Sequence, residues 1–219
     1  MNKTSKTRYL IWVLAAIPLL LVAVFYGKLP DQIPMQWDFG GRVGYEPKWH
    51  IWIVAGLAPL FAVLFPVMQK IDPRRRNYDK FTGSYQFFQV LMMLFVLAMI
   101  GILLTEGLRP GTMNVGKMVC LLCGLLFAAI GNMMPKFRQN YFCGFKTPWT
   151  YADEVVWART QRLGGQLMFC AGLLGMISAF LPTNMLMFIF FFVPLGIAVS
   201  IPLIMSYVWY RARHRNDTQ

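Results

Sequence analysis

Six long runs of apolar residues constrain this 219-residue chain more than any other feature of its sequence. Each run holds roughly 18–22 residues, enough for a helix to cross ~30 Å of hydrocarbon. The predicted spans cover residues 9–27, 51–69, 85–105, 116–134, 163–181 and 185–207. Because a segment in lipid must satisfy its backbone hydrogen bonds internally, such runs predict helices. The sequence therefore predicts an all-α, polytopic membrane protein with about six transmembrane helices.

Composition supports an integral membrane protein without a soluble module. Hydrophobic residues make up 57% of the chain and charged residues 14%, whereas soluble domains average about 25% charged. We expect one integral membrane domain over residues 1–219, with a two-helix part at 1–70 and a four-helix part at 85–210. The first span is longer than a typical signal-peptide core and no A-x-A-like site follows, so we expect it to stay uncleaved.

The basic residues predict the orientation of the spans. With six spans, sixteen of the 21 lysines and arginines fall on one side. These are Lys3, Lys6, Arg8, Lys70, Arg74, Arg75, Arg76, Lys80, Lys136, Arg138, Lys146, Arg159, Arg162, Arg211, Arg213 and Arg215. Positive charge stays in the cytoplasm, so both termini are predicted to be cytoplasmic. The net charge of +12 then reflects topology and attraction to anionic lipid headgroups, and no direct nucleic-acid binding is expected.

Residues 28–48, the first loop, are predicted to lie outside the cell. Three prolines restrict its backbone and three glycines permit tight turns, a mixture typical of neither a helix nor a flexible linker. We expect a structured cap that folds back over the helix ends. Nearby aromatic residues suit the outer aromatic belt. They are Trp37, Tyr45, Trp49 and Trp52.

Residues 135–162, the motif segment, form a polar insert on the predicted cytoplasmic side. Pro148 disfavours helical geometry at Thr147. Thr150 followed by Asp153 resembles a capping box, which predicts Thr150 as the N-cap of a helix running from residue 151 to about 161. The segment also concentrates polar and aromatic side chains, so we look for function here.

Two motifs carry a family resemblance. The first reads Leu29-Pro-Asp-Gln-Ile-Pro-Met-Gln-Trp37, followed by Gly41 and Lys48. The second reads Asn140-x-x-x-Gly-x-Lys-Thr-Pro-Trp-Thr150, followed by Asp153, Trp157 and Arg162. Together with the six spans they resemble the SdpI family of bacterial membrane proteins, over nearly the whole chain. The first motif is similar to the domain of unknown function that precedes the SdpI domain.

The resemblance implies a binding and signalling protein of the bacterial plasma membrane, not an enzyme. It implies immunity to a secreted, SdpC-like toxin peptide and capture of a soluble transcriptional repressor at the cytoplasmic face. The expected peptide-binding residues are Pro30, Ile33, Pro34, Gln36, Trp37, Gly41 and Lys48. The expected partner-binding residues are Asn140, Gly144, Lys146, Thr147, Pro148, Trp149, Thr150, Asp153, Trp157 and Arg159. No cofactor, metal or catalytic residue is expected.

Several alternatives stay open on the residues alone. Asn140, Lys146 and Arg159 could form an anion site beside a helix N-terminus, or could cap backbone groups and meet lipid headgroups. Trp149 and Trp157 could anchor the chain at the membrane interface or form a stacking platform. The basic cluster at residues 72–80 could be a topology anchor or a docking site for an acidic partner.

Other functions are also considered. An enzyme acting on a peptide or lipid could use Cys143, but a nucleophile needs a base and only His50 and His214 are available. A transporter is disfavoured because the spans contain no clear mid-bilayer ionisable residue. The acidic residues of the first loop could bind a cation or pair with its basic ones. Cys120 and Cys123 lack the second ligand pair of a zinc site.

Overall fold

The computed structural model describes residues 3–38 and 42–215. The chain forms two compact units. Unit 1 contains Met1–Val67 and Gln86–Leu122, and unit 2 contains Met68–Tyr85 and Cys123–Gln219. These units are defined by packing. The predicted parts at 1–70 and 85–210 are defined by chain order, and that division stays a prediction.

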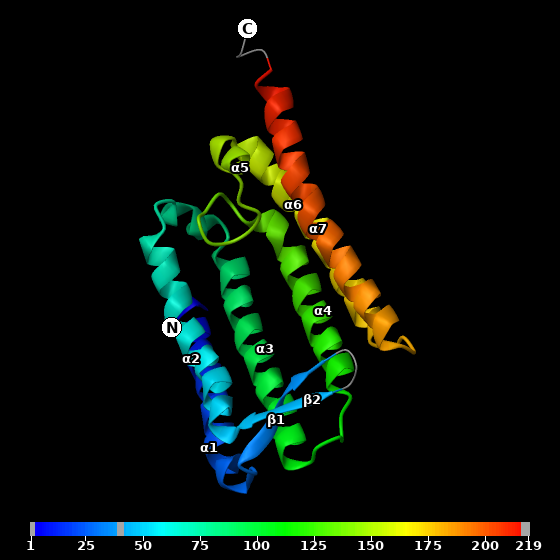
Figure 1. Ribbon diagram of the computed structural model, residues 1–219. Helices are drawn as coiled ribbons and strands as arrows, with labels where there is room; N and C mark the ends of the chain where they lie inside the picture. Colours follow the sequence, from blue (N-terminus) through cyan, green and yellow to red (C-terminus); the bar gives the residue numbers. More distant parts are fainter. Residues whose placement is uncertain (1–2, 39–41, 216–219) are drawn as a thin grey trace. The chain divides into compact units, whose positions relative to one another are not determined.

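Long helices dominate the fold, as predicted (Figure 1). They are α1 (Lys3–Phe25), α2 (Ile51–Ile71), α3 (Thr82–Leu108), α4 (Val115–Met133), α6 (Glu154–Ser178) and α7 (Asn184–Arg213). Five stretches of the described chain are long and apolar enough to cross a membrane. They are Lys6–Lys28, Lys48–Ile71, Thr82–Leu108, Val115–Lys136 and Asn184–Arg213. The all-α membrane class is therefore confirmed, and the predicted count of about six is approximate.

The remaining predicted span, residues 163–181, lies mostly in α6. This helix is 25 residues long, but it is not among the five apolar stretches. It ends at Ser178, three residues before the predicted end, and its last 18 residues include Gln161, Arg162 and Gln166. These polar residues lower the hydropathy of a helix whose length alone would suffice.

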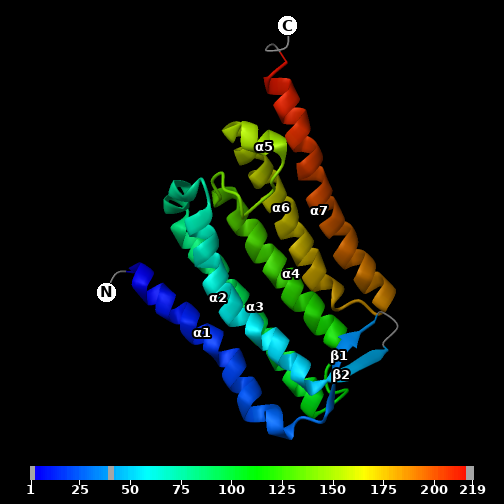
Figure 2. The same ribbon diagram turned by 60° about the vertical axis from the view of Figure 1, so that its left-hand side comes forward.

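The first loop folds into a β-hairpin, a small addition to the predicted all-α class (Figure 2). Strand β1 (Gln32–Trp37) pairs antiparallel with β2 (Val43–Pro47), with an irregularity between Pro34 and Gln36. Ile33 is completely buried and packs with helix residues of unit 1. That core contains Val22, Leu29, Ile51, Ala55, Ile100, Leu103 and Leu104. The expected structured cap is thus a hairpin anchored by one apolar face.

The turn between α3 and α4 is held by Glu106, a residue to which the sequence analysis gave no role. Its buried carboxylate accepts hydrogen bonds from the backbone nitrogens of Gly111 and Met113, at 2.8 and 2.7 Å, and from the Thr112 hydroxyl at 3.2 Å. Gly111 has φ of 79°, a conformation that glycine adopts without strain. Glu106 therefore stabilises the turn as a buried hydrogen-bond acceptor.

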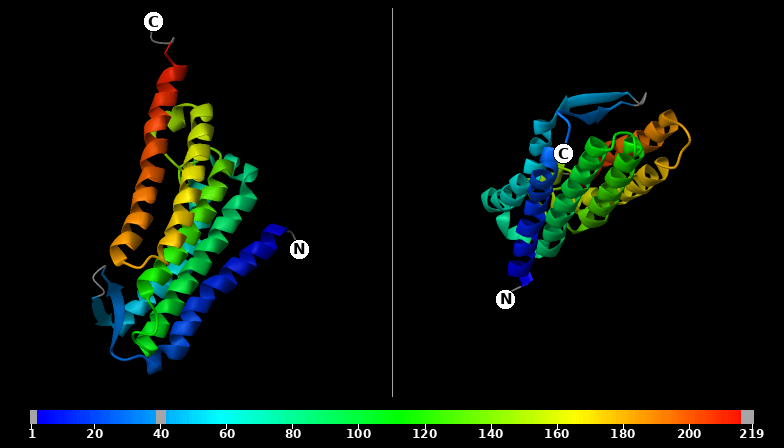
Figure 3. Two further views of the ribbon diagram at one scale, coloured as in Figure 1. Left: turned by 90° about the vertical axis from the view of Figure 1, so that its right-hand side faces the viewer. Right: turned by 90° about the horizontal axis from the view of Figure 1, so that it is seen from below.

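In unit 2, α6 lies alongside α7 (Figure 3) and approaches α4 through glycines. A Cβ atom on Gly131 would clash with the backbone nitrogen of Phe169, and one on Gly172 would clash with that of Ala128. Small residues at these positions allow the two backbones to approach closely, as in many membrane helix pairs. The glycines of α4 and α6 thus allow close packing of the two helices that precede and follow the first part of the motif segment.

Two helices, not one, follow Thr147, and their N-caps differ from the predicted one. Helix α5 (Pro148–Ala152) begins directly after Thr147, which accepts from the backbone nitrogen of Thr150 in a capping box. Thr147 is extended, and a proline suits the first helical position because its missing N–H would be unpaired there. Asp153 then caps α6 by accepting from the nitrogens of Val155 and Val156. The predicted N-cap at Thr150 and single helix to residue 161 were therefore wrong.

Candidate functional site

Asn140 organises the start of the motif segment from a fully buried position. Its amide nitrogen donates to the carbonyl oxygens of Arg138 and Cys143, at 2.8 and 3.1 Å. Its amide oxygen accepts from the backbone nitrogens of Phe142 and Cys143, at 2.9 and 2.6 Å. Because the side chain is 0% exposed, Asn140 shapes the turn and offers no surface of its own to a partner.

Gly144 and Gln161 form the second support of the motif segment. Gly144 has φ of 100°, and a Cβ atom there would clash with the Gln161 side chain. The Gln161 amide accepts from the nitrogen of Phe145 at 3.0 Å and donates to its oxygen at 2.8 Å. Gly144 was among the predicted site residues, whereas Gln161 was not. The structure buries Gln161 completely, and its partner Phe145 is 16 residues away in sequence.

Asp72 joins the connector after α2 to the motif segment. One of its carboxylate oxygens accepts from the Tyr141 nitrogen at 2.9 Å and from the Tyr78 hydroxyl at 3.0 Å. The other accepts from the Arg74 nitrogen at 2.7 Å. Burial raises the pKa of Tyr78. The charge that Cys143 acquires only at high pH and the hydrogen-bonded Asp72 carboxylate raise it further, so the Tyr78 hydroxyl stays a donor. Asp72 was missed because Tyr141, its partner in the motif segment, is distant in sequence.

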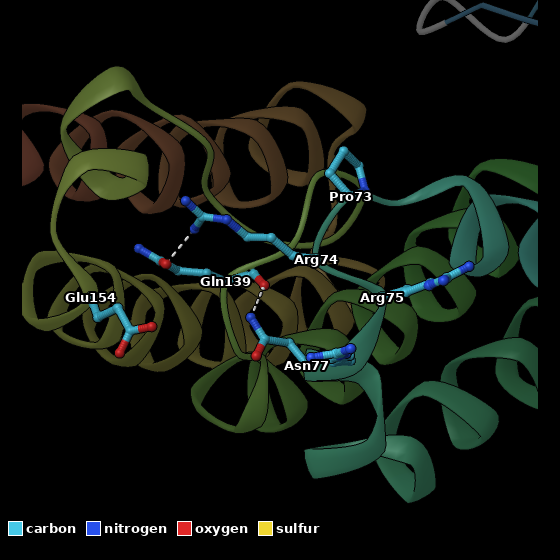
Figure 4. Close-up of a pocket in the computed structure, with 7 residues that line it drawn as sticks. Pro73, Arg74, Arg75, Asn77, Gln139 and Glu154 are labelled. Atoms are coloured by element: carbon cyan, nitrogen blue, oxygen red, sulfur yellow. Dashed lines mark hydrogen bonds between the residues drawn. The ribbon is translucent and has the colours of Figure 1, made fainter.

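Arg74 is the structural member of the basic cluster at residues 72–80. Its guanidinium donates to the Gln139 side chain and to the Tyr151 carbonyl oxygen, and lies over the rings of Tyr141 and Tyr151. Asn77 donates to the Gln139 carbonyl oxygen at 2.7 Å (Figure 4). This part of the cluster therefore fastens the motif segment in place.

Trp157 is a core residue and not an interface anchor. It is buried, and its indole nitrogen donates to the Phe137 carbonyl oxygen at 2.8 Å. Trp149 is half-buried and packs against Tyr207 of α7, with ring centroids 5.1 Å apart. The two tryptophans thus have different environments. Neither forms a flat aromatic platform with the other.

Two polar contacts connect the motif segment to α7. The buried hydroxyls of Thr147 and Ser206 lie 3.1 Å apart. Asp153 accepts from the Arg213 guanidinium at 2.7 Å. Burial alone would raise the pKa of Asp153, but the hydrogen bonds from Arg213 and from the backbone outweigh it and lower that pKa.

Two of the three predicted anion-site residues, Asn140 and Lys146, donate to backbone carbonyl oxygens. Lys146 points its amine at the carbonyl oxygens of Tyr141 and Phe142, at 3.3 and 3.4 Å. Arg159 is exposed, and over the described residues no hydrogen bond or ion pair joins it to Asn140 or Lys146. Asn140 and Lys146 therefore cap backbone groups, which is the simpler of the two alternatives stated above.

Cys143 has the properties of a structural thiol. Burial raises its pKa to about 11, an effect that Lys146 opposes and Asp72 reinforces. A thiol with this pKa is protonated at neutral pH, whereas the thiolate is the nucleophile. The nearby basic groups therefore do not activate it.

The predicted peptide-binding residues of the first loop have two kinds of environment. Ile33 and Pro34 are buried, Trp37 is half-buried, and Pro30 and Gln36 are exposed. Gly41 lies outside the described residues. Lys48 pairs with Asp31 at 3.1 Å. The exposed face is therefore formed by other side chains than those that anchor the hairpin.

The acids of the first loop are paired locally. Asp31 pairs with Lys48, Glu46 lies 3.4 Å from the His50 ring, and Asp38 accepts from the Arg42 nitrogen at 2.7 Å. Among residues 3–38 and 42–215, no group of three or more His, Cys, Asp or Glu residues could hold a metal ion. Local pairing is thus the arrangement that the described part of the loop adopts.

Known proteins resemble this chain along most of its length. Residues 136–206 match the SdpI/YfhL protein family, and residues 13–58 match a domain of unknown function, DUF1648. The "Immunity protein SdpI" of Bacillus subtilis (strain 168) is 23% identical over 201 residues, which cover 91% of this chain and 93% of that protein. No solved structure matches the chain significantly. The predicted resemblance is therefore confirmed: residues 136–206 resemble the SdpI/YfhL family, and residues 13–58, which precede them, resemble DUF1648.

Proposed function

We propose that this chain is a membrane immunity protein that protects a bacterial cell from a secreted antimicrobial peptide. The observation that carries the proposal is the similarity to an immunity protein over 91% of the chain. The two family matches cover the hairpin in the first loop and nearly all of the motif segment. Five apolar helical stretches suitable for a membrane support the same role.

The proposed peptide-binding surface is the exposed face of the first loop and the residues that follow it. Tyr45 is 51% exposed and Trp49 is 54% exposed, with Val43 nearby on β2. Because the charged groups of the loop pair locally, burial of apolar side chains would supply most of the affinity for an amphipathic peptide. Ile33 would contribute indirectly, by fixing the hairpin on its core.

The motif segment is the proposed platform for a soluble transcriptional repressor. Its buried side chains, Asn140 and Gln161 among them, hold a rigid backbone, whereas Tyr141, Lys146 and Pro148 are accessible. A surface presented on a rigid support loses little conformational entropy when it binds. The repressor would therefore contact the accessible residues and not the buried ones.

We also propose that both termini lie in the cytoplasm, which requires an even number of spans. Because five stretches of the described chain are long and apolar enough, an even number of spans requires that α6 crosses the membrane as well. A Phe180→Cys variant, just beyond α6, should react with a membrane-impermeant thiol reagent from outside intact cells, whereas an Arg211→Cys variant should not. Both would be made in a protein with its four natural cysteines replaced by serine or alanine. Labelling of both, or of Arg211→Cys alone, would contradict this topology.

A survival assay tests the immunity proposal. The chain is expressed in a sensitive bacterium that is then challenged with a panel of secreted antimicrobial peptides, with the membrane abundance of the protein measured in parallel. We expect protection against at least one peptide, and its loss in a Tyr45→Ala, Trp49→Ala double variant. Phe180→Ala, which removes another exposed aromatic side chain, serves as the control. Lack of protection against every peptide by well-inserted protein would overturn the proposal.

Repressor recruitment is tested separately. A Tyr141→Ala, Lys146→Ala double variant should keep the survival of the parent while losing peptide-induced retention of a tagged candidate repressor in the membrane fraction. Retention that is unchanged in this variant would remove the motif segment as the platform, without affecting the immunity proposal.

A further inference from the structure

A hollow of about 610 Å³ opens in unit 2 between the connector after α2 and the motif segment. It is lined mainly by cationic and amide side chains, with one carboxylate (Figure 4). The residues that matter are Arg74, Arg75, Arg76, Asn77, Gln139 and Glu154. Nothing in the immunity proposal uses this hollow.

Two of the three arginines are free to bind a ligand. Arg74 is occupied by Gln139 and Tyr151 and forms part of the wall. The side chains of Arg75 and Arg76 are exposed, and the described chain provides no hydrogen bond or ion pair to either guanidinium. Figure 4 shows Arg75 extending away from Arg74, so it would turn about its side-chain bonds to reach a ligand. Guanidinium groups bind phosphate oxygens through paired hydrogen bonds.

The hollow lies close to the end of a membrane helix. The apolar stretch of α2 ends at Ile71 and the next begins at Thr82. Turn hydrogen bonds from the Asp72 nitrogen to the Met68 oxygen and from the Arg75 nitrogen to the Asp72 oxygen keep the connector folded against the helix end. Lipid headgroups occupy roughly the outer 5–7 Å on each side of the hydrocarbon. The free arginines are therefore at headgroup level, whichever side of the membrane they face.

We propose that this hollow binds the headgroup of a membrane phospholipid, with its phosphate held by Arg75 and Arg76. Glu154 supplies a carboxylate at the same site, beside the amide of Gln139. A carboxylate accepts hydrogen bonds only, so it favours headgroups that carry a donor, such as an ammonium or hydroxyl group. Phosphatidylethanolamine and phosphatidylglycerol meet this condition, whereas the choline of phosphatidylcholine carries no N–H or O–H.

The test measures binding of single lipids to the full-length protein in detergent by native mass spectrometry. Phosphatidylethanolamine, phosphatidylglycerol and phosphatidylcholine are titrated separately. For the first two lipids we expect the tightest site to weaken about 30-fold in an Arg75→Gln, Arg76→Gln double variant, since each arginine near a lipid surface contributes roughly a fivefold effect. Both residues are exposed, so the fold should survive, and the thermal unfolding midpoint checks this.

A Lys6→Gln, Arg8→Gln double variant is the matched control. It removes the same charge from two exposed residues at the start of α1. We expect its tightest lipid affinity to stay at the parent value. An equal loss in both double variants would mean general attraction to positive charge and would overturn the site.

Two further arms separate the remaining explanations. Glu154→Ala, which removes the hydrogen-bond acceptor, should remove the preference for ethanolamine and glycerol headgroups over choline, and an unchanged preference would remove Glu154 from the site. Glycerol 3-phosphate is titrated as a soluble compound with the same phosphate chemistry. If it binds as tightly as phosphatidylglycerol, and the arginine variant loses both equally, the ligand is a soluble phosphate and the lipid assignment fails. None of these outcomes depends on peptide immunity.

Discussion

The first loop and the motif segment are both polar, proline-bearing stretches between long helices, yet they are stabilised in different ways. The first loop pairs its backbone in a two-stranded ladder and places most of its polar side chains at the surface. The motif segment contains little regular structure before α5, so side chains supply the hydrogen bonds that its backbone groups need. A polar motif in a sequence can therefore be either a contact surface or an internal frame.

This difference changes the interpretation of the family motif. Four of its polar or aromatic members, Asn140, Thr147, Thr150 and Trp157, are buried. Their hydrogen bonds go to the chain itself, and burying such groups unpaired would be costly. In the first loop, by contrast, only the apolar anchor Ile33 and its neighbours need burial. Substitutions in the motif should thus reduce stability, whereas most substitutions in the hairpin should affect contacts with a partner.

The largest effect is expected for Asn140→Ala. The change leaves four partly buried backbone groups without their partner, and at about 1 kcal/mol for each the protein should lose roughly 4 kcal/mol of unfolding free energy. Thermal unfolding in detergent measures it. Asn114→Ala is the control, because Asn114 is exposed and caps only the Lys117 nitrogen, so that a loss of about 1 kcal/mol is expected. Equal losses would show that the motif segment is not an internal frame.

The next largest loss of unfolding free energy is expected in the hairpin, at its buried residue Ile33. Ile33→Ala removes a completely buried side chain, which should cost about 3 kcal/mol. Val43→Ala, on the exposed face of β2, should change the unfolding free energy by about 0.5 kcal/mol or less. Both are measured by thermal unfolding. A large loss in Val43→Ala would mean that the exposed face of β2 also stabilises the fold. That result would count against this face as the proposed peptide-binding surface.

Asp153→Asn should have an intermediate effect that depends on pH. The side chain caps α6 and contacts the half-exposed Arg213, so we expect a loss of about 1 kcal/mol at pH 7, mostly from the cap. Hydrogen bonds lower the pKa of Asp153 in the folded protein despite burial. The stabilisation is therefore complete above the unfolded value of about 3.9 and is lost as pH falls through the folded pKa.

The measurement is the difference in unfolding midpoint between parent and Asp153→Asn at pH 7 and at pH 3. It should shrink at the lower pH, where the carboxylate of the unfolded parent is mostly protonated. Asp79→Asn, which removes an exposed carboxylate, is the control and should leave the unfolding midpoint at pH 7 almost unchanged. A difference that is constant with pH would rule out the ionised carboxylate as the cause.

The smallest effect is expected at the surface of the first loop. Asp31 pairs with Lys48, but its side chain is 98% exposed, and exposed pairs contribute about 0.5 kcal/mol or less. Asp31→Asn should therefore leave the unfolding midpoint almost unchanged at low and high salt. A loss of unfolding free energy as large as that of Asp153→Asn would mean that the polar groups of the hairpin also stabilise the fold.

Much of the fold could be predicted because its signals are local. Long apolar runs specify helices wherever they occur, and clusters of proline and glycine specify where the helices stop. The predicted N-cap at Thr150 was wrong because two nearby residues were both suitable caps. Both Thr147 and Thr150 can cap a helix, and the proline at the first helical position favoured Thr147.

The amino-acid sequence by itself determined the class of protein, the approximate number of helices and the two loops that matter, because hydrophobic length and proline act within a few residues. Only the tertiary structure decided which polar side chains of those loops are buried. Asp72 contacts Tyr141, and Gln161 contacts Phe145. The physical reason is that a buried polar group must be paired, and its partner comes from whichever segment the packing of helices brings near. Packing also places the side chains of Arg75 and Arg76 at the surface, where the described residues provide no hydrogen bond or ion pair to either guanidinium.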